Sequence, residues 1–200
     1  MPRAIETSRR TAPVDAPQSF GNVIPVYVGV DPGKSGGIAA LFSSEDLRLW
    51  KMPKSFFEIL PVLQEITNAA NGRPVVCTME KVNGYIGGRF NPGAAMFVFG
   101  QNFGHLEAFL FVAGIQVVQV QPSVWIKYFS MKKETVTRLV KKRKTGEVQK
   151  ITGKEAQPHW KRRLLNKAQT LYPKTKIHLD VADAVLLAHY CRTVVSAVSS

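Results

Sequence analysis

The chain has 200 residues, of which 45% are hydrophobic and 10% aromatic, enough apolar material for the core of one domain. Lysine and arginine number 27 against 14 aspartate and glutamate, and the resulting charge of +13 favours a polyanionic partner. Two cysteines, Cys77 and Cys191, are too few for a disulfide scaffold or a cysteine-based zinc site. No run of residues is apolar enough to span a membrane. We therefore expect an intracellular, nucleic-acid-associated domain with no membrane partner.

The first half of the chain predicts an arm followed by strands. Residues 1–23 mix arginine, serine, threonine and proline without periodicity, which predicts a flexible arm ahead of one domain over 24–200. Short apolar runs separated by turn residues, VYVGVD, IAALF and LRLWKM, predict an antiparallel meander of three strands. Apolar residues at helical spacing predict a helix over 54–70, and PVVCTME predicts a buried fourth strand.

The second half alternates helices with one further strand. A glycine-rich loop at 83–93 precedes a predicted long helix over roughly 94–113, a fifth strand at GIQVVQV and a short helix at 123–129. Residues 131–157 are polar and basic and have no apolar period, so no regular element is predicted there. Helices over 158–171 and 180–197 complete the chain. This order is typical of an α/β domain with a mixed sheet.

The positive charge is concentrated in one third of the chain. Between Lys127 and Arg163 there are thirteen lysine and arginine residues against three glutamates, which accounts for +10 of the +13. Trp125, Tyr128 and Trp160 flank this stretch. A charge run is often only a solvated face or loop, but this concentration with aromatic neighbours favours contacts with nucleic-acid phosphates.

Four acidic residues occupy positions where active sites form. Asp31 ends the first predicted strand and Glu80 ends the fourth, while Asp180 and Asp183 lie three residues apart at the start of the last helix. Asp180 alone suits a helix N-terminus, but Asp183 lies within the apolar segment VADAVLLA, where an unpartnered acid is unfavourable. Carboxylates that converge are held together by hard divalent cations, and a pair of such ions can clamp a phosphodiester. A basic surface with such a cluster favours a metal-dependent nuclease.

The motifs GVDPGKSGGIAAL, MEKV, GQNFG and DVADAVLLA, in this order and spacing, resemble those of RuvC-type Holliday junction resolvases. The resemblance runs from Val26 to Cys191, and QPSVWIKYF and WKRRLLNKAQTLYP are closer to phage and chloroplast members. It implies a ribonuclease H-like fold, with a five-stranded mixed sheet of three antiparallel and two parallel strands flanked by helices. Residues 131–157 then form a basic insertion in this nuclease domain.

The same resemblance implies the chemistry. It assigns Asp31, Glu80, Asp180 and Asp183 as catalytic residues that bind two Mg²⁺ ions, for which Mn²⁺ is expected to substitute. The implied activity is the paired nicking of four-way DNA junctions by a homodimer. Two alternatives stay open: a nuclease-fold DNA-binding protein without catalysis, and another ribonuclease H-like nuclease that acts on RNA–DNA hybrids or branched DNA.

Candidate DNA contacts fall in two regions. The glycine-rich loop next to Glu80 carries side chains that can stack on a base or bind a phosphate, and the basic third carries cations. These candidates are Tyr85, Arg89, Phe90, Lys127, Lys132, Lys133, Lys141, Lys142, Arg143, Lys144, Lys161, Arg162 and Arg163. Gly100, Gly104 and Ala108 recur at every fourth residue of the long helix. This smooth face predicts either the dimer contact or close packing on the chain's own sheet.

Overall fold

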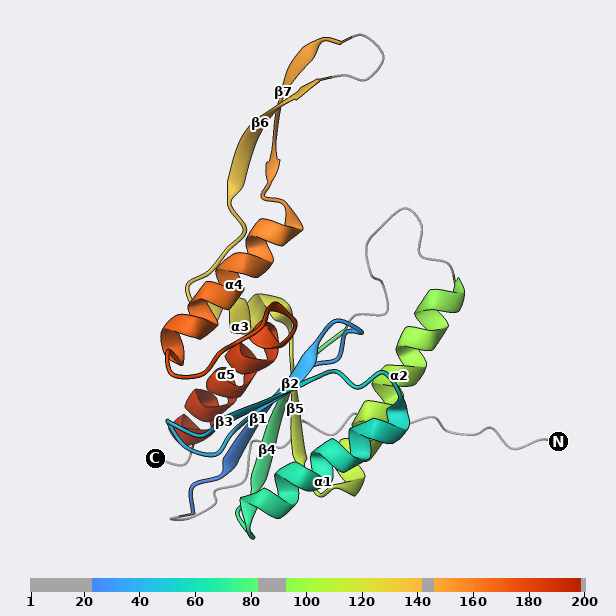
Figure 1. Ribbon diagram of the computed structural model, residues 1–200, viewed down its shortest axis with the longest axis vertical. Helices are drawn as coiled ribbons and strands as arrows, with labels where there is room; N and C mark the ends of the chain where they lie inside the picture. The colour runs from blue at the N-terminus through green and yellow to red at the C-terminus, as the bar shows by residue number, and fades with distance from the viewer. Residues whose placement is uncertain (1–22, 83–92, 142–145, 199–200) are drawn as a thin grey trace, which may run out of the picture.

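The computed structural model describes residues 23–82, 93–141 and 146–198. Its centre is a mixed five-stranded sheet in the order β3-β2-β1-β4-β5 (Figure 1). The strands are β1 Val26–Asp31, β2 Gly37–Leu41, β3 Leu47–Lys51, β4 Val75–Glu80 and β5 Gln116–Val120. β1, β2 and β3 form the antiparallel meander, and β4 and β5 run parallel to β1. The predicted α/β fold class and the division into three antiparallel and two parallel strands are confirmed.

Helices cover both faces of the sheet (Figure 1). Their bounds are η1 Phe56–Glu58, α1 Ile59–Ala70, α2 Gly93–Val112, α3 Pro122–Tyr128, α4 Gln157–Leu171, η2 Leu179–Val181 and α5 Ala182–Val198. α1 and α2 pack on one face with inward residues of β1, β2 and β4, and α3, α4 and α5 share the other core. No helix in the described part of the chain is long and apolar enough to cross a membrane.

Helix α5 lies unusually close to the central strand. A Cβ added to Gly29 in the middle of β1 would fall 2.1 Å from the carbonyl oxygen of Ala184 and 2.3 Å from the amide of Ala188. Only glycine permits this approach. The contact also explains why the first half of α5 is buried on all sides. It fixes Asp183 beside the end of β1.

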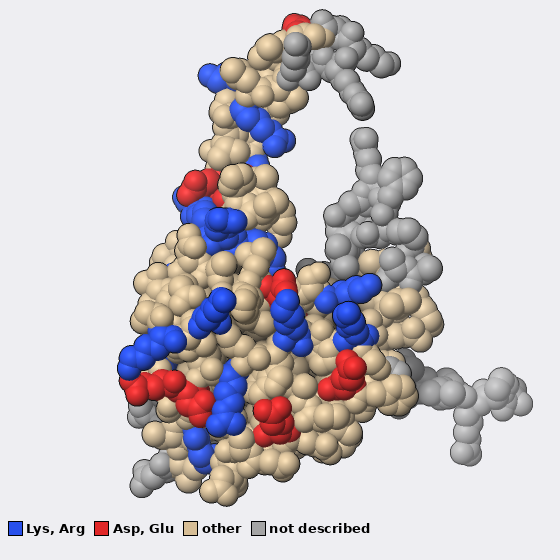
Figure 2. Space-filling view, in the orientation of Figure 1, with Lys and Arg blue, Asp and Glu red and all other residues tan. Residues whose placement is uncertain are grey.

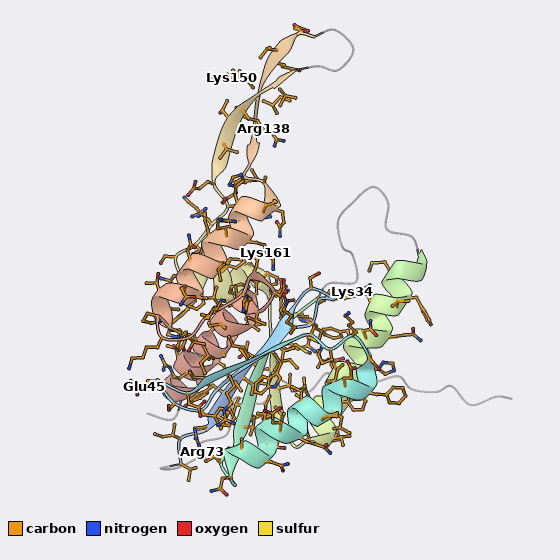
Figure 3. The ribbon with its side chains drawn as sticks, viewed as in Figure 1. Lys34, Glu45, Arg73, Arg138, Lys150 and Lys161 are labelled. Atoms are coloured by element: carbon orange, nitrogen blue, oxygen red, sulfur yellow. The ribbon has the colours of Figure 1, made fainter. Side chains whose placement is uncertain are left out.

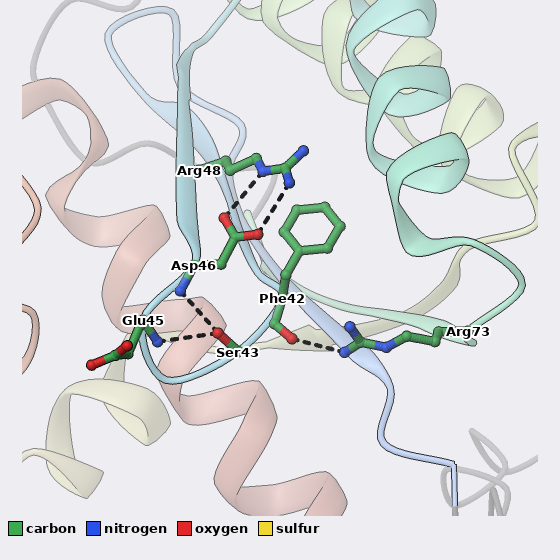
Figure 4. A network of polar contacts seen from close by, with 6 residues as sticks. All are labelled: Phe42, Ser43, Glu45, Asp46, Arg48 and Arg73. Atoms are coloured by element: carbon green, nitrogen blue, oxygen red, sulfur yellow. Dashed lines mark hydrogen bonds and ion pairs between the residues drawn. The ribbon is translucent and has the colours of Figure 1, made fainter.

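The turn between β2 and β3 closes the opposite end of the sheet (Figure 4). The Ser43 hydroxyl accepts the backbone N–H groups of Glu45 and Asp46 at 3.2 and 3.0 Å. The Asp46 carboxylate accepts two hydrogen bonds from Arg48, and Arg73 donates to the carbonyl oxygen of Phe42 at 2.9 Å. This polar network is remote from the carboxyl ends of β1 and β4, where Asp31 and Glu80 lie.

No regular element was predicted for the basic insertion, and this expectation is wrong. The insertion forms an antiparallel two-stranded ribbon of β6 Thr135–Lys141 and β7 Val148–Lys154, which projects from the body beyond α4 (Figure 1). The alternation of threonine and valine at the start of β6 is a strand signal, but Arg138 and Leu139 reverse it after three residues. The expected arm over 1–23 lies outside the described residues except for Val23.

Candidate active site

The topology brings two of the predicted acids to one edge of the sheet. β1 and β4 are parallel neighbours, so Asp31 and Glu80 end at the same rim. Asp183, in the first turn of α5, is 6% exposed and reaches this rim because α5 packs along β1. Asp31 is oriented locally, since its Oδ1 accepts the backbone N–H of Gly33 at 3.1 Å.

A lysine of α4 joins these acids. The Lys161 ammonium donates to Asp183 Oδ2 at 2.5 Å and lies 3.9 Å from Asp31 Oδ2. Figure 3 shows Lys161 projecting from α4 toward the rim where the turn bearing Lys34 also lies. Lys161 is one of the predicted DNA contacts, but its charge is directed into the acidic cluster. The spacing along the chain carries no signal for this contact, because it depends on how α4 packs against α5.

Asp180 lies at the margin of the cluster. Its Oδ2 lies 2.8 Å from the ammonium of Lys51, at the end of β3, with which it forms an ion pair. The Asp180 side chain is 39% exposed. Asp180, Asp31 and Lys161 nevertheless line the same cavity of about 430 Å³, together with Lys34 from the turn after β1. The structure therefore brings three acids together near Lys161, and Asp180 is a partly exposed residue of the adjoining cavity.

Burial and mutual repulsion set the electrostatics. Burial first, then the charge of Asp31, raises the pKa of Glu80 to about 7, although a hydrogen bond from the Trp125 indole N–H at 3.0 Å opposes this shift. Burial likewise raises the pKa of Asp183 against the opposing effect of Lys161. For Lys161, the carboxylates of Asp183 and Asp31 outweigh burial, so its pKa is raised. The cluster thus attracts cations.

The donor set fits a hard divalent cation. Every candidate ligand atom is a carboxylate oxygen, and among the described residues the buried Oδ1 of Asp183 has no hydrogen-bond partner. A positive group, the Lys161 ammonium, already sits against two of the acids. No three His, Cys, Asp or Glu side chains in residues 23–82, 93–141 and 146–198 approach closely enough to form a metal site without adjustment.

The predicted DNA contacts separate into three groups. Lys127, Lys132, Lys133 and Arg162 are exposed. Arg163 is instead an internal partner, because it pairs with Glu155 at 2.6 Å and with Glu134 at 3.1 Å. The rest of the set lies outside the described residues: Tyr85, Arg89, Phe90, Lys142, Arg143, Lys144 and the side chain of Lys141.

The flanking aromatic residues are mostly structural. Trp125 is 1% exposed and Trp160 is 5% exposed, so neither offers a ring to a base, and only Tyr128 is exposed at 41%. Trp125 was not predicted to lie at the acid site, yet its indole N–H donates to Glu80 and orients that carboxylate. The available signal is that a buried indole requires an acceptor for its N–H.

Fold and site together define the class of the protein: an α/β domain of the ribonuclease H-like fold with acids at the carboxyl ends of its central parallel strands. No family model and no curated protein matches the chain. Its fold is similar to that of T. thermophilus RuvC in complex with a Holliday junction substrate, with 14% identity, a TM-score of 0.51, and coverage of 86% of this chain and 94% of that one. A second Thermus thermophilus RuvC structure has 14% identity and a TM-score of 0.48, and covers 86% of this chain and 95% of that one.

Proposed function

We propose that the chain is a structure-selective endonuclease that resolves four-way DNA junctions by paired nicks. One observation carries this proposal: Asp31, Glu80 and Asp183 converge at a sheet edge directly beside the basic helix α4. Repelling carboxylates give a purely structural domain no advantage, whereas they suit a site that binds cations and a phosphodiester. The fold shared with a RuvC bound to a Holliday junction supports the same substrate class.

Each residue has a defined task in this proposal. Asp31, Glu80 and Asp183 would hold Mg²⁺, with Asp180 in the adjoining cavity, and such a metal would supply activation of water and stabilisation of the leaving oxygen. The Gly33 amide and the Trp125 indole fix the orientation of Asp31 and Glu80. Lys161 keeps the acids together before substrate arrives. Lys34, which lines the same cavity, supplies a cation for the substrate phosphate.

Helix α2 supports the proposed homodimer. A Cβ added to Gly100 or Gly104 would meet no atom within 4 Å, so this face does not pack on the chain's own sheet within the described residues. The face formed by Gly100, Gly104 and Ala108 is flanked along the helix by two exposed aromatic rings: Phe97 is 67% exposed and Phe111 is 83% exposed. A two-fold axis near Gly104 would place Phe97 of one copy beside Phe111 of the other.

The finer assignments belong to the same proposal. The segments QPSVWIKYF and WKRRLLNKAQTLYP support a kinship with phage and chloroplast resolvases. An intracellular site of action is part of the same proposal. Residues 24–200 would form one nuclease domain, with the insertion as a part of it.

The test compares three substrates in Mg²⁺: a synthetic four-way junction, a linear duplex and an RNA–DNA hybrid. We expect symmetric nicks in the junction and little cleavage of the other two. Preferred cleavage of the hybrid would replace the proposal with a ribonuclease H-type activity.

A second candidate is a DNA-binding protein without catalysis. It is favoured by the Lys161–Asp183 ion pair, which neutralises part of the acidic cluster without any metal. Tight junction binding with no cleavage in Mg²⁺ or Mn²⁺ would select this candidate.

A further inference from the structure

The β6–β7 ribbon presents two different faces. Side chains alternate across a strand and directly paired residues share a face. One face carries Leu139 opposite Lys150 and Thr137 opposite Thr152, whose hydroxyls lie 3.0 Å apart. The other face carries Arg138 opposite Ile151. The first is called the lysine–threonine face below: Thr135, Thr137, Leu139, Val148, Lys150, Thr152 and Lys154.

The two faces differ in exposure. Every member of the lysine–threonine face is exposed, including the large apolar side chains of Leu139 at 73% and Val148 at 58%. On the other face, Arg138, Gln149 and Ile151 are exposed as well, and only Val136 and Val140 are half-exposed. The difference is therefore in the apolar side chains: Leu139 and Val148 on the lysine–threonine face are more exposed than Val136, Val140 and Ile151 on the other face.

A buried ion pair anchors the ribbon to the body. Glu155, directly after β7, is 8% exposed, and its Oε1 accepts hydrogen bonds from Arg163 at 2.6 Å and from the Glu134 amide at 2.8 Å. Arg163 also donates to the carbonyl oxygen of Lys132, and Lys133 donates to Gln157. These contacts tie both strands to the first turns of α4. A two-stranded ribbon is only marginally stable alone in water. The anchor therefore holds the ribbon in a fixed orientation relative to α4.

We propose that the ribbon docks by its lysine–threonine face in the major groove of a duplex DNA arm. The major groove admits a two-stranded β-ribbon. Strands of seven residues are about 23 Å long at ~3.3 Å per residue, which matches about seven base pairs at ~3.4 Å each. Lys150 and Lys154 reach phosphates, the threonine hydroxyls meet base edges, and Leu139 packs on thymine methyl groups.

This interface lies on a duplex arm, outside the acid cluster. Figure 2 shows lysine and arginine side chains continuing from the body up along the ribbon on the face that is drawn. The inference rests on the proposed function only in taking DNA as the partner. It adds that the protein holds an arm through one groove, some distance from the phosphodiester bond that is cut.

Two adjacent cross-strand pairs give matched variants. Leu139→Ser with Lys150→Ala removes one aliphatic and one basic side chain from the lysine–threonine face. Arg138→Ala with Ile151→Ser removes the same kinds of side chain from the opposite face (Figure 3 labels Arg138 and Lys150). The probes are four-way junctions, in EDTA, whose arms contain either cytosine or glucosylated 5-hydroxymethylcytosine away from the crossover. The sugar fills the major groove and leaves pairing intact.

We expect the wild-type protein to bind the unmodified junction about tenfold more tightly than the glucosylated one, the range for losing a set of groove contacts. The Leu139/Lys150 variant should lose this difference, and the Arg138/Ile151 variant should keep it. Equal effects of the two variants would mean a diffuse charge effect and would overturn the proposal. A wild-type protein indifferent to the sugar would overturn it too.

The result of this binding experiment can be told apart from the result of the cleavage test of the proposed nuclease. If the wild-type protein discriminates between the two junctions but does not cut in Mg²⁺, the ribbon interface stands and the nuclease proposal fails. Circular dichroism and thermal melting of both variants check that the body is folded. Loss of groove discrimination in the Leu139/Lys150 variant counts only with an unchanged melting temperature. If that variant melts early, Lys150→Ala alone, paired with Arg138→Ala, decides the question by the same criterion.

Discussion

The ammonium of Lys161 lies 2.5 Å from Oδ2 of Asp183, and this contact joins the basic helix α4 to a buried acid of α5. The two residues come from α4 and α5, which pack side by side on one face of the sheet. Asp183 shares the site with Asp31 and Glu80, so the contact supplies positive charge to a group of acids that would otherwise repel one another.

Removing the Lys161 charge should destabilise the metal-free protein. Lys161→Met keeps most of the length of the side chain but leaves Asp183 buried without its ion partner, so we expect the free energy of unfolding to fall by about 2 kcal/mol at pH 7. This is below the usual range for a buried pair because the Lys161 side chain is 30% exposed. Urea unfolding in EDTA measures it, with Lys176→Met, at an exposed site, as the control. Adding Asp183→Asn should restore part of the loss, and an unchanged midpoint in Lys161→Met would contradict the role given to Lys161.

Asp31→Asn should abolish cleavage and spare binding. The amide oxygen can still accept the Gly33 N–H, so the turn is retained, but the charge that holds a cation is gone. We expect cleavage of a four-way junction to fall by several orders of magnitude, while binding in EDTA is unchanged or tighter because repulsion of the DNA backbone is reduced. Full activity of this variant would exclude Asp31 from catalysis, and loss of folding would make it structural.

The other acids rank by position. Glu80→Gln and Asp183→Asn should behave like Asp31→Asn, since both side chains lie in the buried cluster. Asp180→Asn should be milder, because Asp180 is partly exposed and already paired with Lys51. Equal losses in all four variants would place Asp180 in the site on the same footing as the rest.

Mg²⁺ should stabilise the folded chain. A ligand that binds only the folded state adds about 2.7 kcal/mol when its concentration is one hundred times Kd, so thermal melting should shift upward by several degrees in Mg²⁺ relative to EDTA. Asp31→Asn should remove this shift. Because melting needs no DNA, a missing shift in the wild-type protein would count against a resident metal whatever the cleavage assay gives.

The sheet could be predicted from sequence because its signals are local. Each strand is a short apolar run bounded by turn residues, and the two acids that end β1 and β4 mark the carboxyl ends of parallel neighbours. The ribbon was missed because a two-stranded element with one fully exposed face buries too little apolar surface to show a hydrophobic period. The ion pair that anchors the ribbon, Glu155–Arg163, joins residues eight positions apart, and nothing in the sequence indicates that these two side chains meet.

The arrangement of the candidate site could be predicted only in part, for a similar reason. Residue type and position single out acids that the structure brings to one rim, since carboxylates after buried strands are informative. The partners Lys161 and Trp125 come from α4 and α3, and only tertiary packing determines which carboxylate each one meets. Asp180 and Asp183 are three residues apart, yet η2 ends between them, so they do not share an environment.

Gly104→Leu should yield a folded monomer. The position is open in the described structure, so a leucine there meets no atom of its own chain and should preserve or slightly raise the stability of α2. In a dimer it would prevent the close approach of two α2 helices. Sedimentation at micromolar concentration measures the state, with Asn102→Leu, on the opposite side of α2, as the control. A monomeric wild-type protein that still makes paired nicks would disprove the dimer.

Acid should weaken the fold through His189. Burial first, then the charges of Arg192 and Lys167, lowers the pKa of His189 from 6.5 to about 4. The ring is enclosed by Tyr172, whose hydroxyl lies 3.0 Å from Nδ1, and by the Phe129 ring, so no acid is among the groups found to face it. The unfolded chain therefore binds a proton at a higher pH than the folded one. The stability that neutral His189 contributes is complete above pH 6.5 and is lost as the pH falls toward 4.

The measurement is the free energy of unfolding by urea at pH 7 and pH 5. The wild-type protein should lose about 1 to 2 kcal/mol more over this interval than His189→Gln, a figure reduced because the ring is partly exposed to solvent. Glu80, with its raised pKa, acts in the opposite direction, but it is common to both proteins and cancels in the comparison. His178→Gln, at an exposed position, should follow the wild-type slope. If His189→Gln keeps the wild-type slope as well, the acid sensitivity of the fold arises elsewhere.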